Sequence, residues 1–195
     1  MVSRISDITR VFRKDRPLEI LTHPNPLLTQ PCEAVDMDRD TEIADLIAGL
    51  KAAMRTYDGI GMAASQAGIL KRLLVYDISE QQDDPRVLIN PEIIAHSDEL
   101  ATADEGCLSF PNIYFPVTRP ARVSVSALDE EGNPLVLEDI EGLLGRVVQH
   151  ECDHLDGIMI IDRATPEIRK QALRAYATFD QQSEEFITIE GDRSP

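Results

Sequence analysis

Apolar residues recur at helical spacing in three parts of the chain. The first begins near Asp40, keeps one apolar face over three turns, and stops at Asp58 and Gly59. Its apolar positions are Ile43, Leu46, Ile47, Leu50 and Met54. The second has an apolar stripe over residues 143–148 and ends at Gly157, and the third begins at Thr165-Pro166 and runs to about Phe179. We predict a helix in each part.

Shorter apolar runs predict strands. Residues 73–78 and 87–89 are two such runs, and residues 123–128 alternate between apolar and small polar side chains with a period of two. A turn at 130–134 then leads into residues 135–137, which predicts a hairpin. Strands grouped between a first helix and a late helix, without regular alternation, indicate an α+β fold.

The chain divides into one domain and two flanking segments. Residues 1–16 form a basic N-terminal arm, and residues 181–195 form an acidic tail that we expect to be poorly ordered. Residues 17–180 are long enough for one catalytic domain with a substantial core.

Composition and charge narrow the classes of protein. The 43% hydrophobic and 28% charged residues are typical of a globular protein, and we expect neither a signal peptide nor a membrane span, so a cytoplasmic location. The net charge of −16 would repel phosphate backbones, which argues against direct binding of nucleic acid. Three cysteines favour a reducing compartment or a metal-binding thiolate over a disulfide framework.

The second predicted helix contains His150-Glu151-x-x-His154. Positions four apart lie on one helix face, so both imidazoles can bind one metal ion. Glu151 lies about 100° around the helix, where it can reach a metal-bound water without binding the metal. This arrangement is typical of metal-assisted hydrolysis. The alternative is a pair of core histidines with no metal.

Cys107 is the strongest candidate for a third ligand. It follows Gly106, which permits a tight turn, and a thiolate suits zinc or ferrous iron. Its alternative role is that of a small buried apolar residue. Cys152 lies about 160° from His154 around the helix, so we expect a packed thiol there.

We considered two other functions for a chain with these metal ligands, a metallopeptidase and a catalytically silent metal-binding module. A metallopeptidase of the long zincin type would need a histidine at position 160, which is Ile160. A peptidase with a downstream glutamate ligand would have Glu167 or Glu184, and neither has a supporting context. A catalytically silent metal-binding module could readily lose Glu151 or Gln66, and this chain keeps both.

Three stretches together resemble the signature motifs of peptide deformylases. They are residues 59–66 (Gly-Ile-Gly-Met-Ala-Ala-Ser-Gln), 105–109 (Glu-Gly-Cys-Leu-Ser) and 149–157 (Gln-His-Glu-Cys-Asp-His-Leu-Asp-Gly). The resemblance implies an α+β fold with antiparallel or mixed β-sheets around a central metal-binding helix. It also implies removal of the N-formyl group from formyl-methionine on newly made polypeptides, with release of formate.

The resemblance assigns the reacting groups. Cys107, His150 and His154 would hold one divalent metal ion, with Fe²⁺ expected and Zn²⁺, Ni²⁺ or Co²⁺ able to substitute. Glu151 would be the general acid and base for attack by metal-bound water. Gln66 would be one of two donors to the oxyanion.

The resemblance also assigns contacts to the substrate. The backbone N–H of Leu108 would be the second oxyanion donor. The backbones of Ile60, with Gly61 beside it, and of Gly106 would align the peptide like an added strand. The partner would be the nascent formylated polypeptide, with transient ribosome association as a further implication.

Three more expectations concern the surroundings of the site. Glu105 would pair with Arg119 and hold the cysteine loop; an ordinary surface pair is the alternative. The methionine side chain would enter an apolar pocket formed by Met62, Phe110, Leu143 and Val147. Tyr114 stands where some relatives carry a basic residue, which leaves substrate contacts beyond methionine open.

Overall fold

The computed structural model describes residues 18–178 and 185–191. Its α-helices in these ranges are α2 (Ile43–Thr56), α3 (Gly142–Leu155) and α4 (Pro166–Thr178). Its strands are β1 (Gly61–Ala63), β2 (Leu73–Tyr76), β3 (Arg86–His96), β4 (Leu100–Cys107), β5 (Phe110–Pro120), β6 (Arg122–Leu128), β7 (Pro134–Glu141) and β8 (Ile187–Thr188). No helix in this part of the chain combines the length and apolarity needed to cross a membrane.

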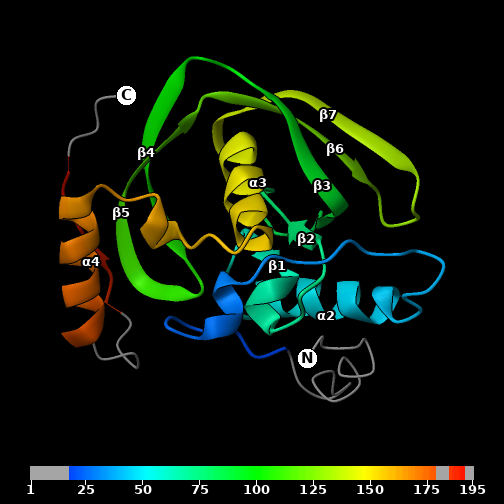
Figure 1. Cartoon of the computed structure of the whole chain (residues 1–195), viewed down its shortest axis with the longest axis horizontal. Coiled ribbons are helices and arrows are strands. Elements are labelled where there is room, and N and C mark those ends of the chain that lie inside the picture. Colours follow the sequence, from blue (N-terminus) through cyan, green and yellow to red (C-terminus); the bar gives the residue numbers. More distant parts are fainter. Residues whose placement is uncertain (1–17, 179–184, 192–195) are drawn as a thin grey trace.

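The strands form two sheets on either side of α3 (Figure 1). One is antiparallel and has the order β1-β2-β3-β6-β7. The other has the order β4-β5-β8, in which β4 and β5 are antiparallel and β8 is parallel to β5. The predicted α+β fold, with antiparallel and mixed sheets around a central helix, is confirmed.

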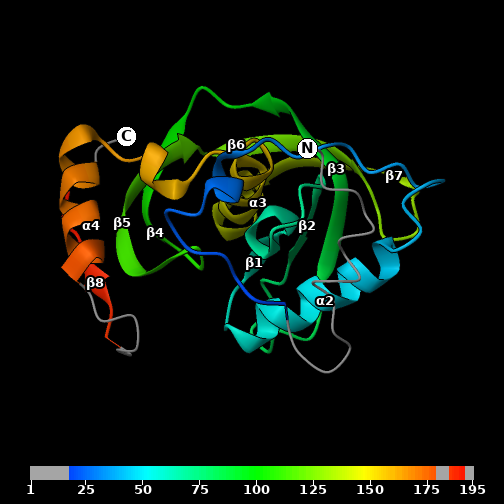
Figure 2. The ribbon, with the colours of Figure 1, turned by 60° about the horizontal axis from the view of Figure 1, so that its bottom comes forward.

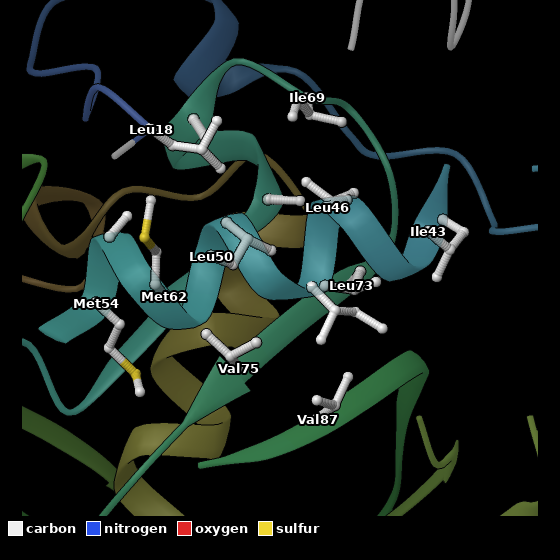
Figure 3. Close-up of a cluster of buried hydrophobic side chains, with 14 of the residues drawn as sticks. Leu18, Ile43, Leu46, Leu50, Met54, Met62, Ile69, Leu73, Val75 and Val87 are labelled. Atoms are coloured by element: carbon white, nitrogen blue, oxygen red, sulfur yellow. The ribbon is translucent and has the colours of Figure 1, made fainter. Parts of the chain in front are cut away.

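Strand β2 is buried on both faces, which explains its continuous apolar run. Leu73 and Val75 pack toward α2, while Leu74 and Tyr76 belong to the cluster that contains the apolar side of α3. Figure 3 shows the α2 side of this arrangement. Burying a leucine or valine side chain contributes about 1.5–3 kcal/mol, so α2 is held to the sheet by its apolar face.

The predicted helices and the four predicted strands are present, with shifted ends. The first helix begins at Ile43 rather than near Asp40, and the run at 87–89 is the start of the longer strand β3. The predicted hairpin is β6 and β7. Thr165 caps α4, since its Oγ1 accepts a hydrogen bond from the Ile168 N–H at 3.3 Å. The hairpin of β4 and β5 was not predicted.

Part of the predicted acidic tail packs on the smaller sheet. β8 pairs with Ile113 and Tyr114 of β5, and it lies beside α4 (Figure 2). The expectation of poor order is therefore wrong for residues 185–191. The basic arm at residues 1–16 lies outside the described residues, and the domain boundaries stay a prediction.

Candidate metal centre

The smaller sheet and the central helix α3 bring three metal-ligating side chains together. Cys107 ends β4, and His150 and His154 lie one turn apart on α3. One ligand atom from each lies within 4.8 Å of the others, and Cys107 Sγ is 3.1 Å from His154 Nε2. The prediction that Cys107 completes the histidine pair is confirmed.

The donor set fits a divalent metal ion. His150 Nδ1 is 3.0 Å from Glu105 Oε2, so the other ring nitrogen is free to face the cluster. Burial lowers the pKa of His154 well below its ordinary value, which keeps the ring in the neutral form that binds metal. One thiolate and two imidazoles suit zinc and ferrous iron, and three protein ligands leave a coordination position open.

A network of buried charges supports Glu105. Arg119 donates from Nε and Nη2 to the two carboxylate oxygens, at 2.7 and 2.9 Å, and Arg146 Nη1 adds a bond of 2.6 Å. Arg119 also donates to Asp153 Oδ2 at 2.8 Å, and Arg163 binds the same carboxylate. Glu105 and Arg119 do pair as predicted. The pair is buried, so the surface alternative is wrong.

The sequence analysis missed three members of this network, Arg146, Asp153 and Arg163, and the first two lie on α3. Arg146 is four residues before His150, and Asp153 is three residues after it. Both spacings place side chains on the same side of a helix. That periodicity, applied to the charged residues of the helix, could have found them.

Glu151 is buried against β1. Burial raises the pKa of its carboxyl to about 7, and its Oε2 has no hydrogen-bond partner in the structure. The close contact depends on Gly61, where an added Cβ would lie 2.5 Å from Glu151 Oε1 and 2.8 Å from Val147 Cγ1. The absence of a side chain at Gly61 therefore permits the close approach of β1 to α3.

Gln66 directs its amide nitrogen toward Cys107, in the metal-binding group. Its Oε1 accepts the Ala63 N–H at 2.8 Å, and its Nε2 donates to Ser109 Oγ at 3.2 Å. Nε2 is also 3.8 Å from Cys107 Sγ. Ser109 is a polar contact that the sequence analysis did not assign, although it closes the cysteine motif.

A cleft of about 710 Å³ opens onto this cluster. Most of the predicted site residues line it: Ile60, Gly61, Gln66, Gly106, Cys107, Leu108, His150 and Glu151. His154 lies beneath them with 1% of its surface exposed.

Two of the four residues predicted to form the methionine pocket lie at the cleft, and the other two do not. Leu143 and Val147 line the cleft. Met62 is instead buried in the α2 cluster, and Phe110 is buried in a third cluster, where it stacks on Tyr176. Cys152 is a buried thiol on the sheet side of α3, as predicted.

Comparisons with known proteins agree with this geometry. Residues 17–170 match the family model described as polypeptide deformylase. A peptide deformylase of Treponema pallidum is 45% identical over 152 residues, covering 78% of this chain and 91% of that protein. One from Pseudomonas aeruginosa is 42% identical over 145 residues, covering 74% and 85%.

Solved structures give the same result. A peptide deformylase from Legionella pneumophila superposes with a TM-score of 0.77 at 34% identity, covering 83% of this chain and 94% of that one. One from Synechococcus elongatus in complex with actinonin has a TM-score of 0.77 at 38% identity, covering 88% and 91%. Because sequence, fold and metal-binding group agree, the chain belongs to the peptide deformylase family and is a hydrolase.

Proposed function

We propose that this deformylase acts on the formyl-methionine of newly made polypeptides, with Glu151 as its general acid and base. The observation that carries the assignment is the position of Glu151. It is a buried carboxyl with a pKa of about 7, next to the metal-binding group and on the wall of the cleft. A group that titrates near the working pH both accepts and returns a proton efficiently.

Cys107, His150 and His154 would hold one divalent ion, for which we propose Fe²⁺. When bound, this ion supplies Lewis-acid chemistry that lowers the pKa of water at the site. Cys107 is partly exposed and lines the cleft, so the reacting end of the substrate would lie beside it.

Glu151 moves the proton in both halves of the reaction. Its unpartnered Oε2 accepts a proton from the attacking water. The same carboxyl then delivers the proton to the nitrogen of the breaking amide bond, which leaves formate and a free amino terminus. Both transfers need only a carboxyl that is held in place, and the packing of Gly61 against it provides this.

Gln66 and Leu108 stabilise the charge that develops on the formyl oxygen. The Nε2 of Gln66 faces Cys107, and the backbone N–H of Leu108 is the next amide along the chain. Donors fixed before the reaction stabilise the tetrahedral oxyanion without reorganising.

The two walls of the cleft bind the peptide backbone. Ile60 and Gly61 line one part of the cleft and Gly106 another. We propose that their backbone groups pair with the substrate as with an added strand. The methionine side chain would then contact Leu143 and Val147.

The substrate determines the compartment and the partner. Nascent formylated chains place the enzyme in the cytoplasm, with transient association at the ribosome. The residues after Phe179 carry an excess of acidic side chains, which would repel the phosphate backbone of ribosomal RNA. We expect a chain ending at Phe179 to co-sediment with ribosomes as the full chain does.

The test is formate release from formyl-Met-Ala-Ser by protein purified without oxygen, beside Glu151→Ala. We expect formate from the wild type and a loss of about 10²–10⁴-fold in the variant at unchanged metal content. Cleavage of unformylated peptides, with no formate from metal-loaded wild type, would favour the peptidase alternative.

A further inference from the structure

Phe186 is the most exposed large hydrophobic side chain of the described residues, and it lines the catalytic cleft. It is 67% exposed. It lies beyond residue 170, where the match to the family model ends. Ile60, Tyr114 and Leu143 are also exposed and line the same cleft, and exposed apolar side chains gathered around a cleft mark a binding groove.

The segment that carries Phe186 is held firmly. Ile189 is buried and Ile187 packs against the same cluster, on the side of β8 that faces the smaller sheet. The Ile189 N–H donates to the Tyr114 carbonyl oxygen at 2.8 Å. Because side chains alternate along a strand, anchoring positions 187 and 189 directs Phe186 and Thr188 to the other face.

On that face Phe186 meets Tyr114 of β5. Their ring centroids are 5.6 Å apart in an edge-to-face arrangement. The Tyr114 ring in turn lies over Gly106, where an added Cβ would come within 2.4 Å of it. The two rings therefore extend the wall of the cleft outward from the residue that precedes the metal ligand Cys107.

We propose that Tyr114 and Phe186 form an aromatic wall that contacts the side chain of one of the two residues following formyl-methionine, and that this wall favours apolar side chains there. The inference rests on the proposed function. A peptide bound along Gly106 passes Tyr114 within a residue or two of the reacting end, because one extended residue spans about 3.3 Å. An apolar side chain at that point would cover the exposed ring of Phe186.

The experiment compares leucine with asparagine, which has a similar size, at each position after methionine. The four substrates are formyl-Met-Leu-Ser, formyl-Met-Asn-Ser, formyl-Met-Ala-Leu and formyl-Met-Ala-Asn. At one position we expect kcat/KM to favour leucine by on the order of tenfold in the wild type, mainly through KM.

Phe186→Ala should reduce this leucine-to-asparagine ratio by about fivefold, and Phe186→Leu should keep most of it, because a leucine side chain preserves the apolar surface. Ile94→Ala is the matched control. Ile94 is 53% exposed on β3 and does not line the cleft, so this variant should keep the wild-type ratio.

The outcomes distinguish failure of the aromatic wall from failure of the proposed function. Normal formate release with the same ratio in wild type and Phe186→Ala would overturn the aromatic wall and leave the proposed function intact. An equal fall in Ile94→Ala would also overturn it. No formate from any of the four peptides would overturn both.

Discussion

At the scale of single residues, one backbone amide decides which way Gln66 faces. The Ala63 N–H is only a donor, so the side-chain oxygen of Gln66 must accept it. The amide nitrogen is then directed toward Cys107 and the cleft. The donor proposed for the oxyanion is thus fixed before substrate binds, which is the property that electrostatic stabilisation requires.

Replacing this donor should slow the reaction without removing the metal. We expect Gln66→Leu and Gln66→Glu each to lower kcat by about 10²–10³-fold, because loss of one oxyanion donor costs roughly 3–4 kcal/mol. The measurement is kcat, with KM and metal content assayed beside it. Gln66→Glu is the decisive variant, since it keeps an oxygen for Ala63. Near-normal kcat in this variant would refute the donor role.

Residue spacing predicted the metal ligands better than it predicted the charged residues that surround them. His150 and His154 follow from helix geometry, and Cys107 follows from ligand chemistry. The burial of Glu105 does not follow from either, because it depends on how the β4–β5 hairpin packs on α3. Arg146 lay within reach of the same helical spacing and was overlooked.

At the scale of elements, the packing of β1 on α3 depends on Gly61. Any side chain at this position would collide with Glu151 and Val147. Strand β1 thus comes close enough to bury the Glu151 carboxyl, and burial is the chief cause of its raised pKa. One missing side chain on the strand sets the environment of a residue on the helix.

We expect Gly61→Ala to disturb this contact. The variant should destabilise the fold by about 1–3 kcal/mol through overpacking, and formate release by the folded protein should fall at least tenfold. Gly142→Ala is the control, since φ is 58° there and nothing lies within 4 Å of the added carbon. It should cost about 1–2 kcal/mol and spare turnover. Equal turnover in both variants would contradict the role of Gly61.

The charge network ties the β4–β5 hairpin to α3 and should be sensitive to the loss of Arg119. Arg119→Met leaves Glu105 and Asp153 buried with fewer partners, which should destabilise the protein by about 3–5 kcal/mol. Arg122→Met breaks an exposed pair with Glu99 and should cost below about 1 kcal/mol. Urea unfolding measures both.

Metal content and turnover should also fall in Arg119→Met, because Glu105 orients His150. A variant that kept full metal content and normal formate release would show that the network stabilises the fold without supporting the site.

Hydrophobic periodicity predicted the helices and strands whose patterns are regular. It did not predict the β4–β5 hairpin. β5 carries prolines at 111, 116 and 120, which normally argue against a strand. They are tolerated because β8 pairs only with Ile113 and Tyr114 in the described residues. β8 itself has two paired residues, which is too short for any pattern to predict.

At the scale of the whole molecule, the metal-binding group joins two layers of the fold. Cys107 comes from the smaller sheet, and both histidines come from the central helix. The three residues approach one another only in the folded chain, since 43 positions separate Cys107 from His150. Metal that binds the folded state and not the unfolded chain must stabilise it.

Removing the metal should therefore lower Tm. At a metal concentration of a thousand times Kd the stabilisation is about 4 kcal/mol. For a chain of this size that corresponds to a shift of roughly 10 °C. Thermal unfolding with and without a chelator measures it. His154→Ala should abolish the metal-dependent shift, while His96→Ala, at an exposed position on β3, should keep it. If His154→Ala still showed the full shift, the stabilising metal would be bound elsewhere. If chelation left the wild-type Tm unchanged, the two layers would not depend on metal to hold together.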